Sequence, residues 1–329
     1  MADLLDTFNR KINYIRISIT DRCNLRCRYC MPAQGIDLIP HDHILRFEEI
    51  IRLVRVFAES GISKVRLTGG EPLVRKGLVD LIRSLSHIAG IHDLSLTTNG
   101  VLLEPFAEPL FSAGLKRVNI SLDSLRPERF RYITRRGCFD QVWTGIEKSL
   151  RIGFHPVKIN VVAMRGFNDD EILSLARLTL DHPLHVRFIE YMPAGNGQPW
   201  RLDDVLTISQ IKDVIEALGP LSVDDTQDRS GPAAVYRLEG AKGRIGFISP
   251  VSCHFCESCN RLRLTSDGKL RPCLFSDEEI DLRQPLRNGC DDARLRDLLE
   301  LALQKKPRGH MVNTHLFKKC QRNMSSIGG

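Results

Sequence analysis

The sequence predicts an α/β protein: an incomplete (β/α)6 TIM-like barrel followed by an α+β extension. Two observations support this. Short apolar runs alternate with longer helical patterns through the first two-thirds of the chain, and six such runs are present. Strands interleaved with helices form parallel sheets with right-handed crossovers. Six strands are too few to close an eight-stranded barrel, so we expect an open one whose reactive loops follow the carboxyl ends of the strands.

The elements are expected in the following order. The barrel strands cover residues 14–20, 64–68, 93–97, 117–122, 157–163 and 185–190, and the helices between them cover 47–60, 74–89, 104–113, 139–153 and 169–180. An Asn-Asp-Asp start signal introduces the last of these helices. Residues 195–204 are polar and serve as a connection. The extension then has helices at 208–218 and 293–304, strands at 235–238 and 244–249, and a small flexible tail at 324–329.

Composition sets broad limits on function. The chain has 329 residues, 42% hydrophobic and 26% charged, which is ordinary for a globular protein. No apolar run approaches the ~20 residues of a membrane span, and the amino terminus lacks the apolar stretch of a secretory signal. We therefore expect a cytoplasmic protein with no membrane partner. The net charge of +7 suits either nucleic acid or a polyphosphate ligand. Since no nucleic-acid-binding motif is found, we expect no nucleic acid partner.

The cysteines are more informative than the charge. Seven of the ten fall into two groups near opposite ends of the chain, at Cys23, Cys27 and Cys30 and at Cys253, Cys256, Cys259 and Cys273. A reducing compartment keeps such thiols free, and clustered thiols in that setting are typical of metal ligands.

The first group follows directly on the first expected strand. Three thiolates can hold three irons of a 4Fe–4S cluster and leave the fourth iron open for a ligand. The alternative is a structural zinc site, but structural zinc takes four protein ligands and no fourth lies nearby.

The spacing Cys-x3-Cys-x2-Cys, with Tyr29 before the third cysteine, resembles that of radical S-adenosylmethionine (SAM) enzymes. The resemblance implies a radical SAM type of barrel, with SAM on the open iron as the source of a 5′-deoxyadenosyl radical. Gly69-Gly70-Glu71-Pro72, at the end of the second strand, resembles the family's motif for the methionine amino group. Taken alone it could be a simple turn. The residues that the resemblance implies for SAM binding are Tyr29, Gly70, Glu71, Ser121 and Met192.

The second group has four cysteines, which suits a zinc ribbon or a fully ligated cluster. Residues 260–263 and 268–275 nevertheless resemble the GTP 3′,8-cyclase branch of the radical SAM family. That resemblance implies a second 4Fe–4S cluster on Cys256, Cys259 and Cys273, with an open iron for guanine. Cys253 departs from the pattern and is expected to be a bystander, although its ligation stays open. Cys138, Cys290 and Cys320 match no ligand spacing.

A triphosphate in a partly dry cavity needs several cations, and arginine forks suit phosphate oxygens. The resemblance implies a GTP site formed by Arg16, Lys64, Arg66, Thr97, Lys158, Arg187, Arg261, Leu262 and Arg263. Several of these charges lie inside apolar strands, where they are costly unless paired. For each residue alone, a structural salt bridge is a rival explanation. No Walker-type loop is present, so kinase or GTPase chemistry is not expected.

The resemblance extends from Arg16 to the terminal Gly328-Gly329, and it implies catalytic roles for these three residues. It implies a lyase that converts GTP to (8S)-3′,8-cyclo-7,8-dihydroguanosine 5′-triphosphate, the first step of molybdenum cofactor biosynthesis. An external one-electron reductant and a downstream cyclic pyranopterin monophosphate synthase are the implied partners, and a homodimer stays open. We expect residues 1–195 to carry the first cluster, and residues 196–329 to carry the second cluster and the Gly-Gly tail.

Two alternatives stay open from the sequence. One is a radical SAM peptide maturase with an auxiliary cluster. It would need neither the basic residues nor the terminal glycines. The other is a non-catalytic zinc-binding or nucleic-acid-binding protein in which both cysteine groups are structural. Iron analysis separates the second alternative from the enzyme, because two 4Fe–4S clusters contain about eight irons.

Overall fold

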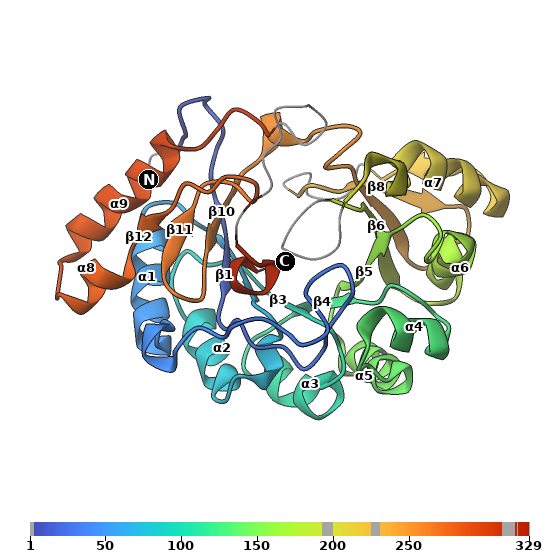
Figure 1. Ribbon diagram of the computed structural model, residues 1–329, viewed down its shortest axis with the longest axis horizontal. Helices are drawn as coiled ribbons and strands as arrows, with labels where there is room; N and C mark the ends of the chain where they lie inside the picture. Colours follow the sequence, from blue (N-terminus) through green and yellow to red (C-terminus); the bar gives the residue numbers. More distant parts are fainter. Residues whose placement is uncertain (1–2, 193–199, 225–230, 311–319, 321, 329) are drawn as a thin grey trace.

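A single curved sheet organises the computed structural model, which describes residues 3–192, 200–224, 231–310, 320 and 322–328. The sheet order is β12-β11-β10-β1-β2-β3-β4-β5-β6-β9-β8-β7, and the sheet curls around a central space with helices outside it (Figure 1). The central strands are β1 (Tyr14–Ser18), β2 (Lys64–Thr68), β3 (Asp93–Thr98), β4 (Arg117–Ser121), β5 (Val157–Ala163) and β6 (Leu184–Glu190). The six predicted barrel strands are confirmed, side by side and parallel.

The parallel sheet is wider than six strands. β10 (Arg261–Leu264) pairs parallel with β1, and β9 (Arg244–Ile248) pairs parallel with β6. Both of these strands come from the last third of the chain, so the extension adds a parallel strand to each edge of the barrel. Antiparallel strands then flank the parallel set: β11 (Lys269–Arg271) and β12 (Ile280–Asp281) on one side, β8 (Ala234–Leu238) and β7 (Leu221–Val223) on the other.

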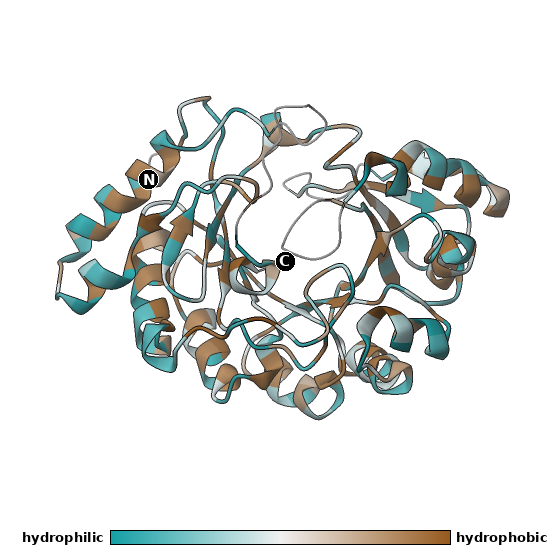
Figure 2. Ribbon diagram, viewed as in Figure 1, coloured by the Kyte–Doolittle hydropathy of each residue, from teal (hydrophilic) through white to brown (hydrophobic). Residues whose placement is uncertain are grey.

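The helices cover the outer surface of the sheet. They are α1 (Phe47–Glu59), α2 (Leu78–Ser86), α3 (Leu103–Ser112), α4 (Pro127–Thr134), α5 (Phe139–Ile152), α6 (Ile172–Asp181), α7 (Ile208–Ile215), α8 (Arg283–Arg287) and α9 (Asp292–Gln304). Their apolar residues join one core cluster with the strand residues that point outward. Figure 2 shows the resulting alternation of hydrophilic and hydrophobic residues along these helices.

One expectation about the helices is wrong, and two helices, α4 and α8, are absent from the prediction. Helix α2 begins at Leu78 and not near residue 74, because Pro72–Val74 forms a 3-10 turn and Gly77 has a φ of 80°. Helix α4 was not predicted. It begins at Pro127, a residue that suits the first turn of a helix.

The carboxyl-terminal tail is also not flexible as predicted. Met324–Ile327 forms helix α10, and residues 325–328 are buried. The helix lies beside β1 within the curve of the sheet (Figure 1). The tail sequence is short and polar, so its order comes from burial against the barrel and not from helix propensity.

Strand alternation sends polar side chains into the central space, which we call the lumen. In β2, Val65 and Leu67 are fully buried in the core cluster, while Lys64 and Arg66 lie on the other face and are partly exposed. Successive strand residues point to opposite faces, so charged residues at every second position line the lumen. Among the described residues, no helix is long and apolar enough to cross a lipid bilayer.

Candidate active site

The first cysteine group lies in the loop after β1, at the carboxyl ends of the parallel strands. Cys23, Cys27 and Cys30 are all free thiols of intermediate exposure. The loop is tied to helix α4, because the backbone N–H of Arg26 donates to the carbonyl of Thr134 (3.1 Å) and that of Arg28 to Ile133 (2.9 Å). The unpredicted helix therefore helps to hold the three thiols in place.

The glycine motif supports the same loop from the other side. The backbone N–H of Gly70 donates to the carbonyl of Thr20 and that of Glu71 to Arg22, each at 2.7 Å. A Cβ on Gly69 would lie 2.4 Å from the Thr20 oxygen, and one on Gly70 would lie 2.3 Å from the Arg22 oxygen. Both positions must therefore be glycine for the backbones to approach this closely.

Glu71 lies fully buried beneath this contact. Its carboxylate accepts from the backbone N–H groups of Leu73 (3.0 Å) and Asn99 (2.7 Å) and from the hydroxyl of Thr98 (2.7 Å). Burial raises its pKa to about 7, although these donors act in the opposite direction. Through these hydrogen bonds, Glu71 links the end of β2 to the end of β3. The contact predicted for it, with the amino group of SAM, stays a prediction.

Polar groups surround the first thiols. The hydroxyl of Tyr29 donates to Asp123 (2.8 Å), whose pKa burial raises to about 6. The side-chain amide of Asn99 lies 3.8 Å from the Cys23 sulfur. Burial also raises the thiol pKa of Cys23 to about 11 and that of Cys30 to about 12, so these thiols are neutral until a metal replaces their protons.

A strand hairpin assembles the second cysteine group. Cys256 and Cys259 precede β10, and Cys273 follows β11, which runs antiparallel to β10 and returns the chain to its start. The first residue of β10, Arg261, lies opposite Tyr14, the first residue of β1. The second group therefore lies at the amino ends of the parallel strands. The first lies beyond their carboxyl ends, roughly 13 Å of strand away.

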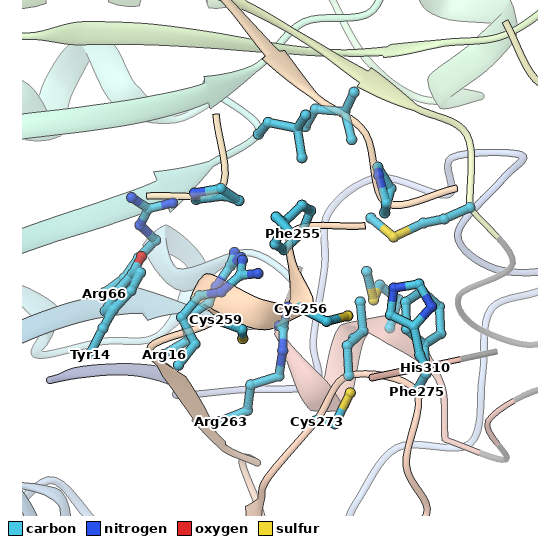
Figure 3. Close-up of a pocket in the computed structure, with 18 of the residues that line it drawn as sticks. Tyr14, Arg16, Arg66, Phe255, Cys256, Cys259, Arg263, Cys273, Phe275 and His310 are labelled. Atoms are coloured by element: carbon cyan, nitrogen blue, oxygen red, sulfur yellow. The ribbon is translucent and has the colours of Figure 1, made fainter. Parts of the chain in front are cut away.

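Between the two ends lies a cavity of about 150 Å³. The second cysteine group and several lumen residues line it together. The lining consists of Tyr14, Arg16, Arg66, Asn160, Arg187, Ile189, Met192, Pro232, Ile248, Pro250, Phe255, Cys256, Cys259, Arg261, Arg263, Pro272, Cys273, Leu274, Phe275, His310 and Met324. Figure 3 shows the three cysteines between Arg66 and Tyr14 on one side and Phe275 and His310 on the other.

The cavity is strongly positive. Five arginines line it, and no carboxylate does so among the described residues. Burial and the neighbouring Arg66 and Arg117 lower the pKa of Arg187 to about 9, and burial and Arg261 lower that of Arg263 to about 10. Clustered arginines that repel one another favour a polyanionic ligand, which would remove this repulsion.

Four buried polar atoms in the lumen also lack a hydrogen-bond partner among the described residues, and one of them is the side-chain oxygen of Asn119. The other three are the hydroxyl of Tyr14, the hydroxyl of Thr97 and the side-chain oxygen of Asn160. An unsatisfied buried polar group is costly. A polar ligand that forms hydrogen bonds with these atoms would therefore stabilise the protein.

The second cysteine group lies in the same positive field. Burial raises the pKa of Cys259, but Arg261 and Lys306 outweigh that effect and lower it to about 6. A thiolate at neutral pH is the form that binds iron. Burial raises the pKa of Cys256, so that thiol gives up its proton only to a metal, whereas Cys259 is ready to bind one. Three thiols lining one cavity therefore fit an iron–sulfur cluster.

Not every predicted GTP residue lines the cavity. Lys64, Thr97, Lys158 and Leu262 are outside its lining. The Leu262 side chain is fully buried in the hydrophobic core, so only its backbone faces the lumen. Lys158 is 6% exposed, and burial together with Arg187 and Arg117 lowers its pKa to about 5. Of the predicted SAM residues, Met192 lines the cavity, while Ser121 ends β4 opposite Asn160.

The tail reaches the lumen at the carboxyl end of β1 and β2. Gly328 has a φ of 84°, and a Cβ there would lie 2.4 Å from the Thr68 methyl group. Its carbonyl accepts a hydrogen bond from Arg263, which also lines the cavity. Gly329 lies outside the described residues, so the role predicted for it stays a prediction.

Several lining residues were missed from the sequence. Tyr14 and Asn160 lie two positions from Arg16 and Lys158 on the same strand face, so strand alternation could have identified them. Phe255, Phe275 and His310 come from loops around the second cysteine group, and no periodic signal marks them.

The remaining cysteines lie away from this cavity. Cys138 and Cys253 are exposed, Cys290 is partly buried, and Cys320 is buried with its sulfur 3.0 Å from the guanidinium of Arg271. Within the described residues, no three His, Cys, Asp or Glu side chains are arranged around a single metal ion. A cubane cluster has a different requirement, because each thiolate binds its own iron.

Two family models match most of the chain. Residues 17–179 match the radical SAM superfamily, and residues 184–312 match Molybdenum Cofactor Synthesis C. The chain is 54% identical to a GTP 3′,8-cyclase of Alkaliphilus metalliredigens, covering 98% of this chain and 99% of that protein. It is also 54% identical to the GTP 3′,8-cyclase of Moorella thermoacetica, with the same coverage.

Solved structures agree on the fold. SuiB of Streptococcus suis superposes with a TM-score of 0.63 at 15% identity, covering 90% of this chain and 67% of that one. Its complex with SAM gives a TM-score of 0.61 at 14% identity, covering 94% and 76%. At these identities the likeness concerns the arrangement of the barrel alone.

Proposed function

The chain belongs to the GTP 3′,8-cyclase family of the radical SAM superfamily. We propose that one end of its lumen serves SAM cleavage and that the other end serves GTP binding. The family uses SAM and two 4Fe–4S clusters to convert GTP to (8S)-3′,8-cyclo-7,8-dihydroguanosine 5′-triphosphate, the first step of molybdenum cofactor biosynthesis. In this chain, Cys23, Cys27 and Cys30 hold the first cluster at the carboxyl end of the strands. Cys256, Cys259 and Cys273 hold the second at the amino end.

When bound, the first cluster supplies the electron that cleaves SAM, and the second supplies an open iron for the purine. The protein itself positions the two cysteine groups and the substrate. Gly69 and Gly70 hold the first loop against the ends of β1 and β2, while the hairpin of β10 and β11 places the second group beside the arginines. A substrate held at both ends across the lumen presents its ribose between them, and such fixed orientation lowers the barrier to reaction.

The arginines of the lumen bind the triphosphate. Arg16, Arg66 and Arg187 project from β1, β2 and β6, so they approach a ligand from different sides of the cavity. Arg261 and Arg263 extend the same field toward the second cysteine group. Guanidinium groups bind phosphate oxygens through charge-assisted hydrogen bonds. Lys158 lies outside the cavity lining, and its lowered pKa favours the neutral amine. A bound triphosphate favours protonation of this amine.

The tail closes the lumen near the radical end. Gly328 lies against Ser18 and Thr68, and its carbonyl is held by Arg263. The tail thereby fills space between the two cysteine groups that water would otherwise occupy. Excluding water protects a reactive carbon radical from side reactions.

The reaction also has requirements outside the chain. Reductive cleavage consumes an electron, so an external one-electron reductant is needed, and the cyclised product requires a downstream cyclic pyranopterin monophosphate synthase. Reduced thiols and oxygen-sensitive clusters favour the cytoplasm. We retain the division at residue 195 as a functional one, since residues before it carry the first thiols and residues after it the second. The sheet itself is continuous across that point.

The observation that carries the proposal is the shared cavity of three thiols and five arginines without a carboxylate among its described lining. The test is anaerobic incubation of the iron-loaded protein with GTP, SAM and a chemical reductant, followed by mass identification of the product. We expect the cyclised nucleotide and 5′-deoxyadenosine. A protein that binds zinc and no iron after reconstitution would contradict the proposal.

Cysteine variants separate the two ends. Cys23→Ala should abolish SAM cleavage, because the first cluster loses a ligand. Cys273→Ala should leave some uncoupled cleavage but stop cyclisation. Cys138→Ala is the matched control, since Cys138 is exposed and away from the cavity, and it should keep full activity. Undiminished product from Cys273→Ala would contradict the role of the second group.

A further inference from the structure

A buried lysine lies beside the second cysteine group and has no assigned role. Lys306 follows helix α9 and is 3% exposed. Its ammonium donates to the carbonyls of Arg261 (2.7 Å) and Pro272 (2.8 Å) and lies 3.6 Å from the Cys259 sulfur. A lysine is almost never buried without a partner for its charge, and in the described chain no carboxylate forms an ion pair with this one. The sulfur is therefore its anionic partner.

The chain after Lys306 packs against the same group. A Cβ on Gly309 would lie 3.6 Å from the Cβ of Cys256 and 3.8 Å from its sulfur. A backbone hydrogen bond from His310 also reaches Cys256. Residues 306–310, which we call the sulfur-facing segment, therefore direct a hydrogen bond to each of two thiols.

The carbonyl contacts of Lys306 join the cluster to the substrate site. Arg261 begins β10 and lines the cavity, and Pro272 directly precedes Cys273. One ammonium thus holds the two ends of the hairpin that carries these thiols and arginines. If this group is lost, the hairpin ends lose their common hydrogen-bond donor.

We propose that Lys306 is a positioning residue that holds the second cluster and raises the reduction potential of this cluster through the hydrogen bond to the Cys259 sulfur. The inference rests on the proposed function, because it takes Cys256, Cys259 and Cys273 as ligands of that cluster. A positive charge and an N–H donor at a cluster sulfur stabilise the reduced, more negative state and so raise the reduction potential. Lys306 acts on the substrate through the cluster and the hairpin.

The test uses the full chain with Cys23, Cys27 and Cys30 replaced by Ala, so that any remaining cluster signal comes from the second site. In this background Lys306→Met, Lys306→Gln and Lys306→Arg are compared after anaerobic reconstitution. Lys305→Met is the matched control, because Lys305 is the preceding residue but is exposed and paired with Glu278. The readouts are iron and sulfide per chain, the midpoint potential from a spectroscopic redox titration, and GTP affinity by calorimetry.

We expect Lys306→Met to lose iron or, where iron is kept, to shift the midpoint potential downward and weaken GTP binding roughly tenfold or more. Lys306→Gln keeps a donor without the charge, so it should fold and still show the lower potential. Lys306→Arg should keep a potential close to that of the parent. Lys305→Met should match the parent in all three readouts.

The outcomes are distinguishable. If the parent with intact Lys306 binds no iron, the assignment of the second cluster is wrong, and the inference is wrong with it. If the parent binds a cluster but Lys306→Gln and Lys306→Met match Lys305→Met in iron, potential and GTP affinity, the inference alone is overturned. If the Lys306→Met chain fails to fold, the comparison of Lys306→Gln with Lys306→Arg decides the question. Equal midpoint potentials in those two variants would contradict a role for the charge of Lys306.

Discussion

The arginines of the lumen share one physical feature, which is a guanidinium group held in surroundings that disfavour its charge. Arg16, Arg66 and Arg187 lie inside strands of a largely apolar sheet, where burial disfavours their charged forms. Such an arrangement costs stability in the empty protein and gains it when a polyanion binds. The ligand is thus part of the electrostatic balance of the fold.

Lys158 gives a direct test of this balance. Its pKa of about 5 leaves it neutral at pH 7 in the substrate-free protein. A bound triphosphate favours the charged form and raises that pKa, so GTP binding should take up as much as one proton at pH 7. Calorimetry in buffers of different ionisation enthalpy measures this uptake.

The control for this prediction is Lys158→Met, in which the buffer dependence should shrink by the contribution of this lysine. The uptake should also diminish below pH 5, where Lys158 is already protonated without GTP. An identical binding heat in all buffers at pH 7 would show that Lys158 does not respond to the triphosphate.

Residue chemistry explains how much of the site could be predicted. Cysteine spacing and in-strand arginines are visible in the sequence, because thiols and buried guanidinium groups have few other uses at such positions. Lys306 and His310 could not be predicted, since both depend on where a loop some 50 residues beyond Cys256 returns in space. Glu71 shows a different limit of sequence-based prediction. Its motif could be identified, but the three hydrogen-bond donors around its carboxylate could not.

At the scale of elements, the six barrel strands were predictable because each is a compact apolar run. β10 and β11 were missed, since their alternating residues, Arg261, Arg263, Lys269 and Arg271, make them look polar. Helix α4 is polar on average and short, so its helical pattern is weak. In both cases the tertiary environment determines the structure: β10 pairs with β1, β11 pairs with β10, and the helix packs on the cysteine loop.

The glycine turn after β2 gives a prediction about an element. Gly70→Ala places a methyl group 2.3 Å from the backbone oxygen of Arg22, which cannot move without displacing the cysteine loop. We expect the iron at the first site to fall by at least half, with the second site little changed. Iron analysis and SAM cleavage assays measure this. Gly231→Ala is the control, since nothing lies within 4 Å of its Cβ, and a loss of iron there equal to that in Gly70→Ala would contradict the argument.

Helix α10 and the glycine after it give a second prediction. A Gly328→Ala methyl group would lie 2.4 Å from Thr68 and would strain a φ of 84°, so the tail should leave the lumen. We expect product formation to fall at least about tenfold while both clusters stay loaded. Deletion of Gly328 and Gly329 should act in the same direction. Full activity with either change would remove the tail from the mechanism.

Across the whole molecule, the amino terminus is tied to the second cysteine group. Arg10 is 8% exposed, pairs with Asp6 at 2.6 Å, and donates to the carbonyls of Cys256 (2.7 Å), Pro307 (2.7 Å) and Arg308 (3.0 Å). Residues from both ends of the chain therefore converge on one loop. The carboxyl-terminal extension is thus integrated into the barrel, and the two are not independent modules.

This contact predicts a global effect of Arg10→Met. The change leaves the Asp6 carboxylate buried without its partner, which costs about 3–5 kcal/mol. We expect a lower unfolding temperature and a selective loss of iron from the second site. Lys11→Met is the control, because Lys11 forms an exposed pair with Asp3 that contributes about 0–1 kcal/mol. Equal unfolding temperatures for the two variants would contradict the role of Arg10.

The strands that flank the barrel, β9 and β10, are made after its six central strands. While the ribosome synthesises the chain, β1 and β6 each keep an unpaired edge, and such edges invite pairing with other chains. The first thiol loop contacts only elements made up to α4, among them β1, β2 and the end of β3, so it is complete long before the second. At ~5–20 residues per second, the second site follows on the order of ten to thirty seconds later. The nascent protein can therefore accept its two cofactors in sequence, and its open edges require protection during that interval.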